Sequence, residues 1–230
     1  MKLIFLKQRL VEKLISELLK KKSMFWKGSL REVIKTCNYD GILDILKTIP
    51  DDEWKKDTEV RNSKAKIGGN TNLDTRALML KYKSSAVTGP GFADYEKNDV
   101  ETLNKLKPIL DEIISDAKNF YGYENLKLTN ILFTELKKGG IIPEHSDSGP
   151  MLTTNHRIHI PILSDPAVKF TLDHKDYYLE PGHGYEINNQ LVHDVRNESN
   201  IDRIHMIIDL KEWKNNDKEI KAYEVDLKNY

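Results

Sequence analysis

The stretch Arg157-Ile-His-Ile-Pro-Ile-Leu163 decides the fold class, because aliphatic residues occupy every second position within it. In a β-strand this spacing places the aliphatic side chains on one face and the arginine and histidine on the other. The stretch Arg203-Ile-His-Met-Ile-Ile-Asp-Leu210 repeats the pattern, again with an arginine and a histidine on one face. Two such strands predict a β-barrel whose interior carries polar side chains that could contact a ligand.

Further short segments with strand character surround these two, separated by residues typical of turns. The predicted strands are Leu128–Leu136, Arg157–Leu163, Val168–Leu172, Tyr177–Leu179, Gly184–Ile187 and Arg203–Leu210. The predicted turns are Gly139-Gly140, Asp165-Pro166, Asp173–Asp176 and Pro181-Gly182. Many short strands at this spacing favour a jelly roll or a related barrel. We therefore expect an α+β fold with a mainly β core, a double-stranded β-helix (jelly roll, cupin-like), with N-terminal and flanking helices.

Helices are expected in the part of the chain before this core. Apolar residues recur at helical spacing over residues 3–18, 40–49 and 100–120, and Pro108 can kink the last of these helices. Residues 62–72 and 87–94 are loop-like, and the second loop is either a lid over a site or an ordinary surface loop. We expect a single domain over 1–230, with 1–126 a mostly helical supporting part, 127–210 the jelly-roll core and 211–230 a C-terminal tail.

The composition excludes several function classes. The 230 residues include 36 basic and 36 acidic side chains, so no overall field favours nucleic acid or a membrane surface. Cys37 is the single cysteine, which excludes an internal disulfide and fits a reducing, cytoplasmic compartment. No apolar run approaches the ~18–20 residues of a membrane span. The chain also lacks a Walker loop, a GxGxxG after a strand, an HExxH and a GxSxG.

One short motif carries metal chemistry. His145 and Asp147 are two residues apart, so in an extended segment both side chains project to the same side. His193 would join them from a distant strand that a double-stranded β-helix winds back beside the first. Two histidines and a carboxylate are the ligand set of the facial site that holds non-haem Fe(II) and leaves positions open for oxygen and a cosubstrate. The alternative is that Asp147 caps the following turn and that the histidines are solvated or core residues.

Arg203 follows the second histidine and lies among aliphatic residues, which predicts that it is buried. A buried guanidinium needs an anion, because an unpaired charge in apolar surroundings is costly. A structural partner could be Asp202 or Asp209. The functional alternative is the distal carboxylate of 2-oxoglutarate, for which arginine offers a bidentate fork.

With these residues in view, the sequence resembles the aspartyl/asparaginyl β-hydroxylase family of Fe(II)- and 2-oxoglutarate-dependent oxygenases. The resemblance spans roughly residues 130–210 and rests on spaced anchors. These are Phe133-Thr134, Gly140, Pro143-x-His145, Arg157-x-His159-x-Pro161, Gly182, His193, Asn197, Arg203-x-His205 and Asp209.

The resemblance implies a role for each matching residue. His145 and His193 match the iron-ligating histidines, and Arg203, assisted by the hydroxyl of Thr134, matches the anchor for the far carboxylate of 2-oxoglutarate. Arg157 and His159 match a strand that faces the active site, where they would contact the cosubstrate or a carboxylate of the substrate. Some animal members have glycine in place of the carboxylate ligand, whereas Asp147 completes the triad in this chain.

The sequence therefore predicts a dioxygenase that uses Fe(II), 2-oxoglutarate and O2 to hydroxylate an unactivated C–H. We expect the substrate to be a free amino acid, or an amino-acid residue such as Asp, Asn or Pro in a peptide or protein, and no nucleic-acid or membrane partner. Two rivals stay open at this point. One is a cupin-like metalloenzyme that does not use 2-oxoglutarate, and the other is a catalytically inactive jelly-roll module that binds a small acid.

Overall fold

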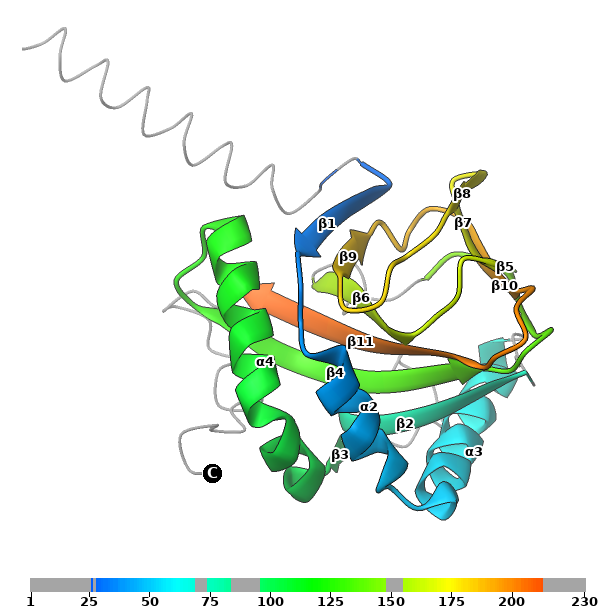
Figure 1. The fold of residues 1–230 in the computed structure, drawn as a ribbon, viewed down its shortest axis with the longest axis horizontal. Coiled ribbons are helices and arrows are strands. Elements are labelled where there is room, and N and C mark those ends of the chain that lie inside the picture. The colour runs from blue at the N-terminus through cyan, green and yellow to red at the C-terminus, as the bar shows by residue number, and fades with distance from the viewer. Residues whose placement is uncertain (1–25, 27, 69–73, 84–95, 148–154, 213–230) are drawn as a thin grey trace, which may run out of the picture.

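A computed structural model of the chain describes residues 26, 28–68, 74–83, 96–147 and 155–212. Two antiparallel sheets form its core, and three helices pack around the larger sheet (Figure 1). The larger sheet has the strand order β1-β9-β6-β11-β4-β2-β3 and the smaller sheet the order β5-β10-β7-β8. The large-sheet strands are β1 (Leu30–Ile34), β2 (Thr75–Lys83), β3 (Glu96–Asn98), β4 (Leu126–Leu136), β6 (His156–Leu163), β9 (Gly184–Ile187) and β11 (Arg203–Glu212). The small-sheet strands are β5 (Ile141–His145), β7 (Val168–Leu172), β8 (Lys175–Tyr177) and β10 (His193–Asn197).

The chain passes back and forth between the two sheets as it runs from β4 to β11. Strands β4, β6, β9 and β11 lie in the large sheet, while β5, β7, β8 and β10 lie in the small one. This winding, with every pairing antiparallel, is that of a double-stranded β-helix. The expected α+β jelly-roll fold is confirmed.

The alternation of β6 and β11 separates two environments. Aliphatic residues of both strands, from Ile158 and Ile160 on β6 to Met206 and Ile208 on β11, join the main core beneath the helices. The opposite face carries the arginines and histidines toward the small sheet. A second apolar cluster, which includes Phe170 and Val195, closes the space between the sheets around this polar face. The predicted division of the two strand faces is confirmed.

The helices follow from local signals and from the sheet they cover. Helix α4 (Val100–Tyr121) begins after Asp99, whose side chain accepts a hydrogen bond from Thr102 N, and ends at Gly122 in the left-handed conformation. Its apolar face packs on the large sheet together with that of α2 (Tyr39–Lys47). Both helices match the predicted segments. No helix in the described part of the chain is long and apolar enough to cross a membrane.

Helix α3 (Asp51–Gly68) corrects the prediction of a loop over residues 62–72, because the helix continues to residue 68. Besides Trp54, which joins the main core, hydrogen bonds and an ion pair attach α3 to the large sheet. The buried carboxylate of Asp57 accepts hydrogen bonds from Met79 N at 2.8 Å and Lys97 Nζ at 2.6 Å, and the hydroxyl of Thr58 accepts one from Ala77 N at 2.9 Å. A helix held in this way lacks the 3.6-residue apolar period that reveals helices in a sequence.

Five strands were not predicted: β1, β2 and β3 in the first half of the chain, and β5 and β10 in the small sheet. The first part of the chain thus contributes strands to the large sheet as well as helices. The predicted strand Tyr177–Leu179 overlaps β8 only at Tyr177, because Asp173 and His174, both at positive φ, complete the turn and the strand resumes at Lys175. The predicted helix over residues 3–18, the loop at 87–94 and all but the start of the C-terminal tail lie outside the described residues.

Candidate active site

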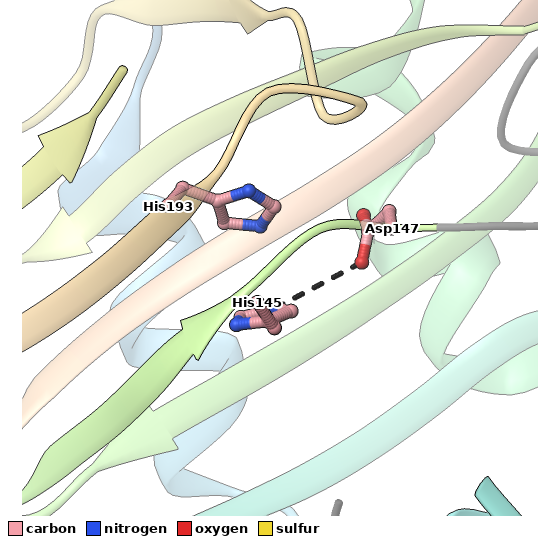
Figure 2. Close-up of side chains that lie close together, drawn as sticks. All are labelled: His145, Asp147 and His193. Atoms are coloured by element: carbon pink, nitrogen blue, oxygen red, sulfur yellow. Dashed lines mark ion pairs between the residues drawn. The ribbon is translucent and has the colours of Figure 1, made fainter. Parts of the chain in front are cut away.

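The pairing of β5 with β10 places His145 directly opposite His193 in the small sheet. Asp147 follows the end of β5, and its backbone N–H donates to Asn189 O at 2.8 Å. This bond holds Asp147 against the segment that connects β9 to β10. One ligand atom from each of His145, Asp147 and His193 lies within 4.8 Å of the others. Figure 2 shows the three side chains close together, with a dashed line between His145 and Asp147. Nε2 of His145 lies 3.9 Å from Oδ1 of Asp147. No other such group of potential ligands occurs among the described residues.

Backbone carbonyls select the ring nitrogen that each histidine offers. Nδ1 of His145 lies 2.8 Å from the carbonyl oxygen of Pro143, and Nδ1 of His193 lies 2.8 Å from that of Leu191. A carbonyl oxygen only accepts, so each Nδ1 carries the hydrogen and each Nε2 keeps a free lone pair. Burial, reinforced by the neighbouring His145, lowers the pKa of His193, which favours the neutral ring that a metal requires. The donor set fits a divalent transition metal.

Arg157 stands behind the carboxylate of this group. Its Nε and Nη2 donate to the two carboxylate oxygens of Asp209 at 2.8 and 2.9 Å, and its Nη1 donates to Oδ2 of Asp147 at 2.9 Å. Burial alone would lower the pKa of Arg157, but the charges and hydrogen bonds of Asp209 and Asp147 outweigh it and raise the pKa. Arg157 is therefore a permanent cation between two carboxylates.

Arg203 occupies the other end of the polar face and has no carboxylate partner among the described residues. The structural candidates are engaged elsewhere: Asp202 pairs with Lys137, and Asp209 with Arg157. The side chain is 2% exposed, and its Nε has no hydrogen-bond partner within the described chain. Burial lowers the pKa of Arg203 to about 9, as expected of a cation without a counter-charge.

Three more buried polar atoms beside Arg203 lack a hydrogen-bond partner among the described residues: Thr134 Oγ1, His159 Nδ1 and His205 Nε2. Thr134 and His205 are directly opposite each other on β4 and β11. Burial, followed by the charge of Arg203, holds the pKa of both His159 and His205 well below its usual value, so both rings are neutral at pH 7. A buried polar group without a partner costs about 1–3 kcal/mol, so four of them on one sheet face indicate a place prepared for a polar ligand.

A cavity of about 360 Å³ joins the two ends of the site. It is lined by all seven residues that the sequence singled out, His145, Asp147, His193, Arg203, Thr134, Arg157 and His159. Its volume lies in the range of about 300–1,000 Å³ that suits small-molecule ligands. The fold thus brings the predicted metal ligands and the predicted cosubstrate residues into one space.

Sequence reasoning missed several residues of this site. Arg61 and Asn62 reach the cavity from α3, and Phe170 reaches it from β7. His205 lies beside Arg203, with Arg203 Nη2 at 2.5 Å from His205 Nδ1. The repeated Arg-x-His pattern places His205 on the polar face of its strand, but it gave His205 no role in the site. Helix α3 gave no signal because it lacks an apolar period, and the predicted loop began only at residue 62.

A double-stranded β-helix with two histidines and a carboxylate on adjoining strand ends has the architecture of a non-haem metal enzyme. A sequence model of the family described as Aspartyl/Asparaginyl beta-hydroxylase matches residues 52–212, which is more than half of the chain. The chain belongs to this family. It is therefore an enzyme, a 2-oxoglutarate-dependent hydroxylase. No curated protein matches it in sequence.

Solved structures show weaker likeness. A 2OG-Fe(II) oxygenase-family oxidoreductase from Burkholderia pseudomallei has 12% identity, covers 61% of this chain and 70% of its own, and gives a TM-score of 0.47. The viral collagen prolyl hydroxylase from Paramecium Bursaria Chlorella virus-1, in complex with 2OG, has 8% identity, coverage of 82% and 98%, and a TM-score of 0.45. A Pseudomonas putida prolyl-4-hydroxylase has 10% identity, coverage of 81% and 94%, and a TM-score of 0.43. Because these TM-scores are low, the class rests on the family match and the site geometry.

Proposed function

We propose that the enzyme hydroxylates an unactivated C–H of an amino acid, either free or within a peptide, with Fe(II) held by His145, Asp147 and His193. The supporting geometry is the convergence of one ligand atom from each residue, with both histidines presenting Nε2. Bound iron and 2-oxoglutarate would together supply the oxidising chemistry, consuming O2 and releasing succinate and carbon dioxide as one oxygen atom enters the substrate.

The observation that carries this proposal is the buried Arg203, a cation without a carboxylate partner among the described residues, in the same cavity as the metal cluster. The far carboxylate of 2-oxoglutarate would satisfy this charge and accept hydrogen bonds from Arg203 and Thr134. His159 and His205, both neutral, could form further hydrogen bonds with the bound 2-oxoglutarate. A metalloenzyme that does not use 2-oxoglutarate would leave these four polar groups without a purpose, which argues against the cupin-like rival.

Arg157 and the apolar lining have supporting tasks. Arg157 holds Asp147 through Nη1 while Asp209 neutralises its charge, so in this geometry it orients a metal ligand. Ile142, Val195 and Ile207 line the cavity together with Phe170 and limit the room for water beside the reacting atoms.

The substrate would lie on the side of the cavity lined by α3, because the cosubstrate would fill the Arg203 side. Arg61 adds a positive charge there, and its Nη2 donates to Thr75 O at 2.7 Å, which fixes the guanidinium at the wall. Such a wall suits a substrate that carries a carboxylate. This favours an amino acid, and it fits aspartyl, asparaginyl or prolyl compounds with a free carboxyl group.

The test is succinate formation with Fe(II), 2-oxoglutarate and O2 across a panel of amino acids and peptides, each compared with its decarboxylated or amidated analogue. We expect at least one carboxylate-bearing compound to stimulate succinate formation and to gain one oxygen atom by mass. Stimulation by a compound without hydroxylation, or equal stimulation by the amidated analogues, would contradict the proposed substrate class. The absence of 2-oxoglutarate turnover under any condition would favour the inactive binding module.

A further inference from the structure

Asp209 is a buried carboxylate that the proposed metal site does not contact directly, yet it is connected to that site through one side chain. Asp209 on β11 is the register partner of Arg157 on β6, and it is 1% exposed. On its other side Asp209 pairs in register with Asn130 of β4, whose Nδ2 donates to Asp209 Oδ2 at 3.0 Å. Three neighbouring strands at the centre of the large sheet therefore fix the position of this carboxylate.

The geometry of the guanidinium gives Asp209 an influence on Asp147. The group is planar, with donors in a fixed fork, and Asp209 occupies the edge made of Nε and Nη2. In the orientation that this pairing fixes, Nη1 faces Asp147 and bonds to a single oxygen, Oδ2. The other oxygen, Oδ1, is the one that lies 3.9 Å from Nε2 of His145.

Without Asp209, the guanidinium of Arg157 would be free to turn a two-donor edge toward Asp147. An arginine in that situation tends to bind both oxygens of a carboxylate, which is the strongest arrangement available to the pair. Asp147 would then be turned away from the histidines, and its two oxygens would be shared with a cation that competes with the metal. Asp209 opposes this change by holding the guanidinium in the orientation in which only Nη1 bonds to Asp147.

We propose that Asp209 is a positioning residue that, by engaging the fork of Arg157, reserves Oδ1 of Asp147 for the metal ion. This inference rests on the proposed metal site and adds a residue outside it. It assigns Arg157 to the support of the metal ligand, in addition to any contact with a small molecule.

The chain contains a matched control for this idea. Glu135 on β4 and Arg76 on β2 are also register partners in the large sheet, and Arg76 donates from Nε and Nη2 to the two oxygens of Glu135 at 3.1 and 2.6 Å. Glu135 is 5% exposed and does not line the cavity. Glu135→Gln therefore removes the same kind of buried cross-strand pair without touching the metal site.

The experiment measures Mn(II) affinity of the full chain by electron paramagnetic resonance titration, with circular dichroism and thermal unfolding to establish that each variant is folded. We expect Asp209→Asn to weaken Mn(II) binding by about 10–100-fold, the usual effect of losing an outer support of a metal ligand. Glu135→Gln should change it less than about twofold. In an Arg157→Gln background, Asp209→Asn should have little further effect, since the connection is already broken.

Each outcome is decisive. If the wild type binds no Mn(II), the proposed metal site itself fails. If the wild type binds Mn(II) but Asp209→Asn binds it as tightly as Glu135→Gln does, the positioning role is wrong and the metal site stands. Should Asp209→Asn not fold, Asp209→Glu takes its place, because it keeps the charge but displaces the carboxylate by one methylene and so changes how the fork of Arg157 is engaged. Wild-type Mn(II) affinity in folded Asp209→Glu would overturn the inference, and a loss of about tenfold or more would support it.

Discussion

Arg203 Nη2 lies 2.5 Å from Nδ1 of His205, two residues further along β11, and this contact defines the protonation of the histidine. A guanidinium only donates hydrogen bonds, so Nδ1 of His205 accepts and its hydrogen lies on Nε2. That Nε2 is buried and has no acceptor within the described chain. His205 thus aligns Arg203 and also presents a donor of its own beside Thr134.

His205→Asn separates these two tasks. The asparagine carbonyl can still accept from Arg203, but no group replaces the Nε2 donor. A neutral hydrogen bond contributes about 0.5–1.5 kcal/mol, so we expect the Kd for 2-oxoglutarate to rise by roughly 2–13-fold. Isothermal titration of the Mn(II)-loaded protein measures this change. An unchanged Kd would show that His205 serves only to hold Arg203.

Arg203→Lys keeps the positive charge and removes the fork. Because a lysine ammonium cannot make the planar two-point contact, 2-oxoglutarate should bind more weakly, by about 1.5–3 kcal/mol or roughly 13–160-fold. The affinity for Mn(II) alone should stay close to that of the wild type, since Arg203 does not contact the metal cluster. Equal cosubstrate affinity in Arg203→Lys and wild type would remove the main support for the cosubstrate assignment.

Asp147→Ala should abolish turnover and leave the fold intact, because Asp147 is a partly exposed residue at the end of β5. Succinate formation and circular dichroism are the two measurements. Asp176→Ala, an exposed carboxylate change on β8, is the control and should retain activity. Full turnover by Asp147→Ala would show that the carboxylate is not a needed ligand in this chain.

The buried carboxylate of Glu186 should make the stability of the fold depend on pH. Glu186 of β9 accepts hydrogen bonds from Arg31 Nε at 2.6 Å, Tyr121 Oη at 2.9 Å and His156 Nδ1 at 2.7 Å. Burial alone would raise the pKa of Glu186, but His156 and Arg31 outweigh it and lower the pKa below the ordinary value of 4.5. A lowered carboxyl pKa stabilises the folded state above the ordinary pKa, and this contribution is lost as the pH falls through the folded-state value.

Glu186→Gln should therefore destabilise the protein by about 2 kcal/mol near pH 7, where the charged hydrogen bonds are intact. The difference in free energy of unfolding between the variant and the wild type should shrink as the pH falls below 4.5, the ordinary pKa of a glutamate. Urea unfolding at several pH values between about 3 and 7 measures it. A difference that does not depend on pH would contradict the ionic role of Glu186.

The strands that could be predicted are those whose own sequence alternates apolar and polar residues. Strands β6 and β11 separate aliphatic from polar side chains residue by residue, so their faces and their polar interior followed from the sequence. Strands β5 and β10 were not predicted, because residues of the site interrupt the alternation of apolar and polar side chains in them. β5 is an edge strand with Pro143 in it, and each of the two strands ends or begins at a histidine of the proposed metal site.

Contacts that depend on register between strands were not predictable. The seven site residues could be named from spacing and family resemblance, but the pairing of Arg157 with Asp209 follows from the alignment of β6 against β11. The sequence suggested Asp209 as a possible structural partner of Arg203, but Asp209 pairs with Arg157 instead. The α3 wall was hidden for a similar reason, because Asp57 and Thr58 attach that helix through polar bonds to β2.

The most direct test of the central claim is a titration of 2-oxoglutarate into the Mn(II)-loaded protein, beside the same titration into the metal-free protein and into Arg203→Ala. Binding that requires both the metal and Arg203 is the predicted result, since the ligand should span the histidine–aspartate cluster and the buried guanidinium. Equal binding with and without metal, or equal binding by wild type and Arg203→Ala, would contradict the assignment of this cavity as an Fe(II)- and 2-oxoglutarate-dependent active site.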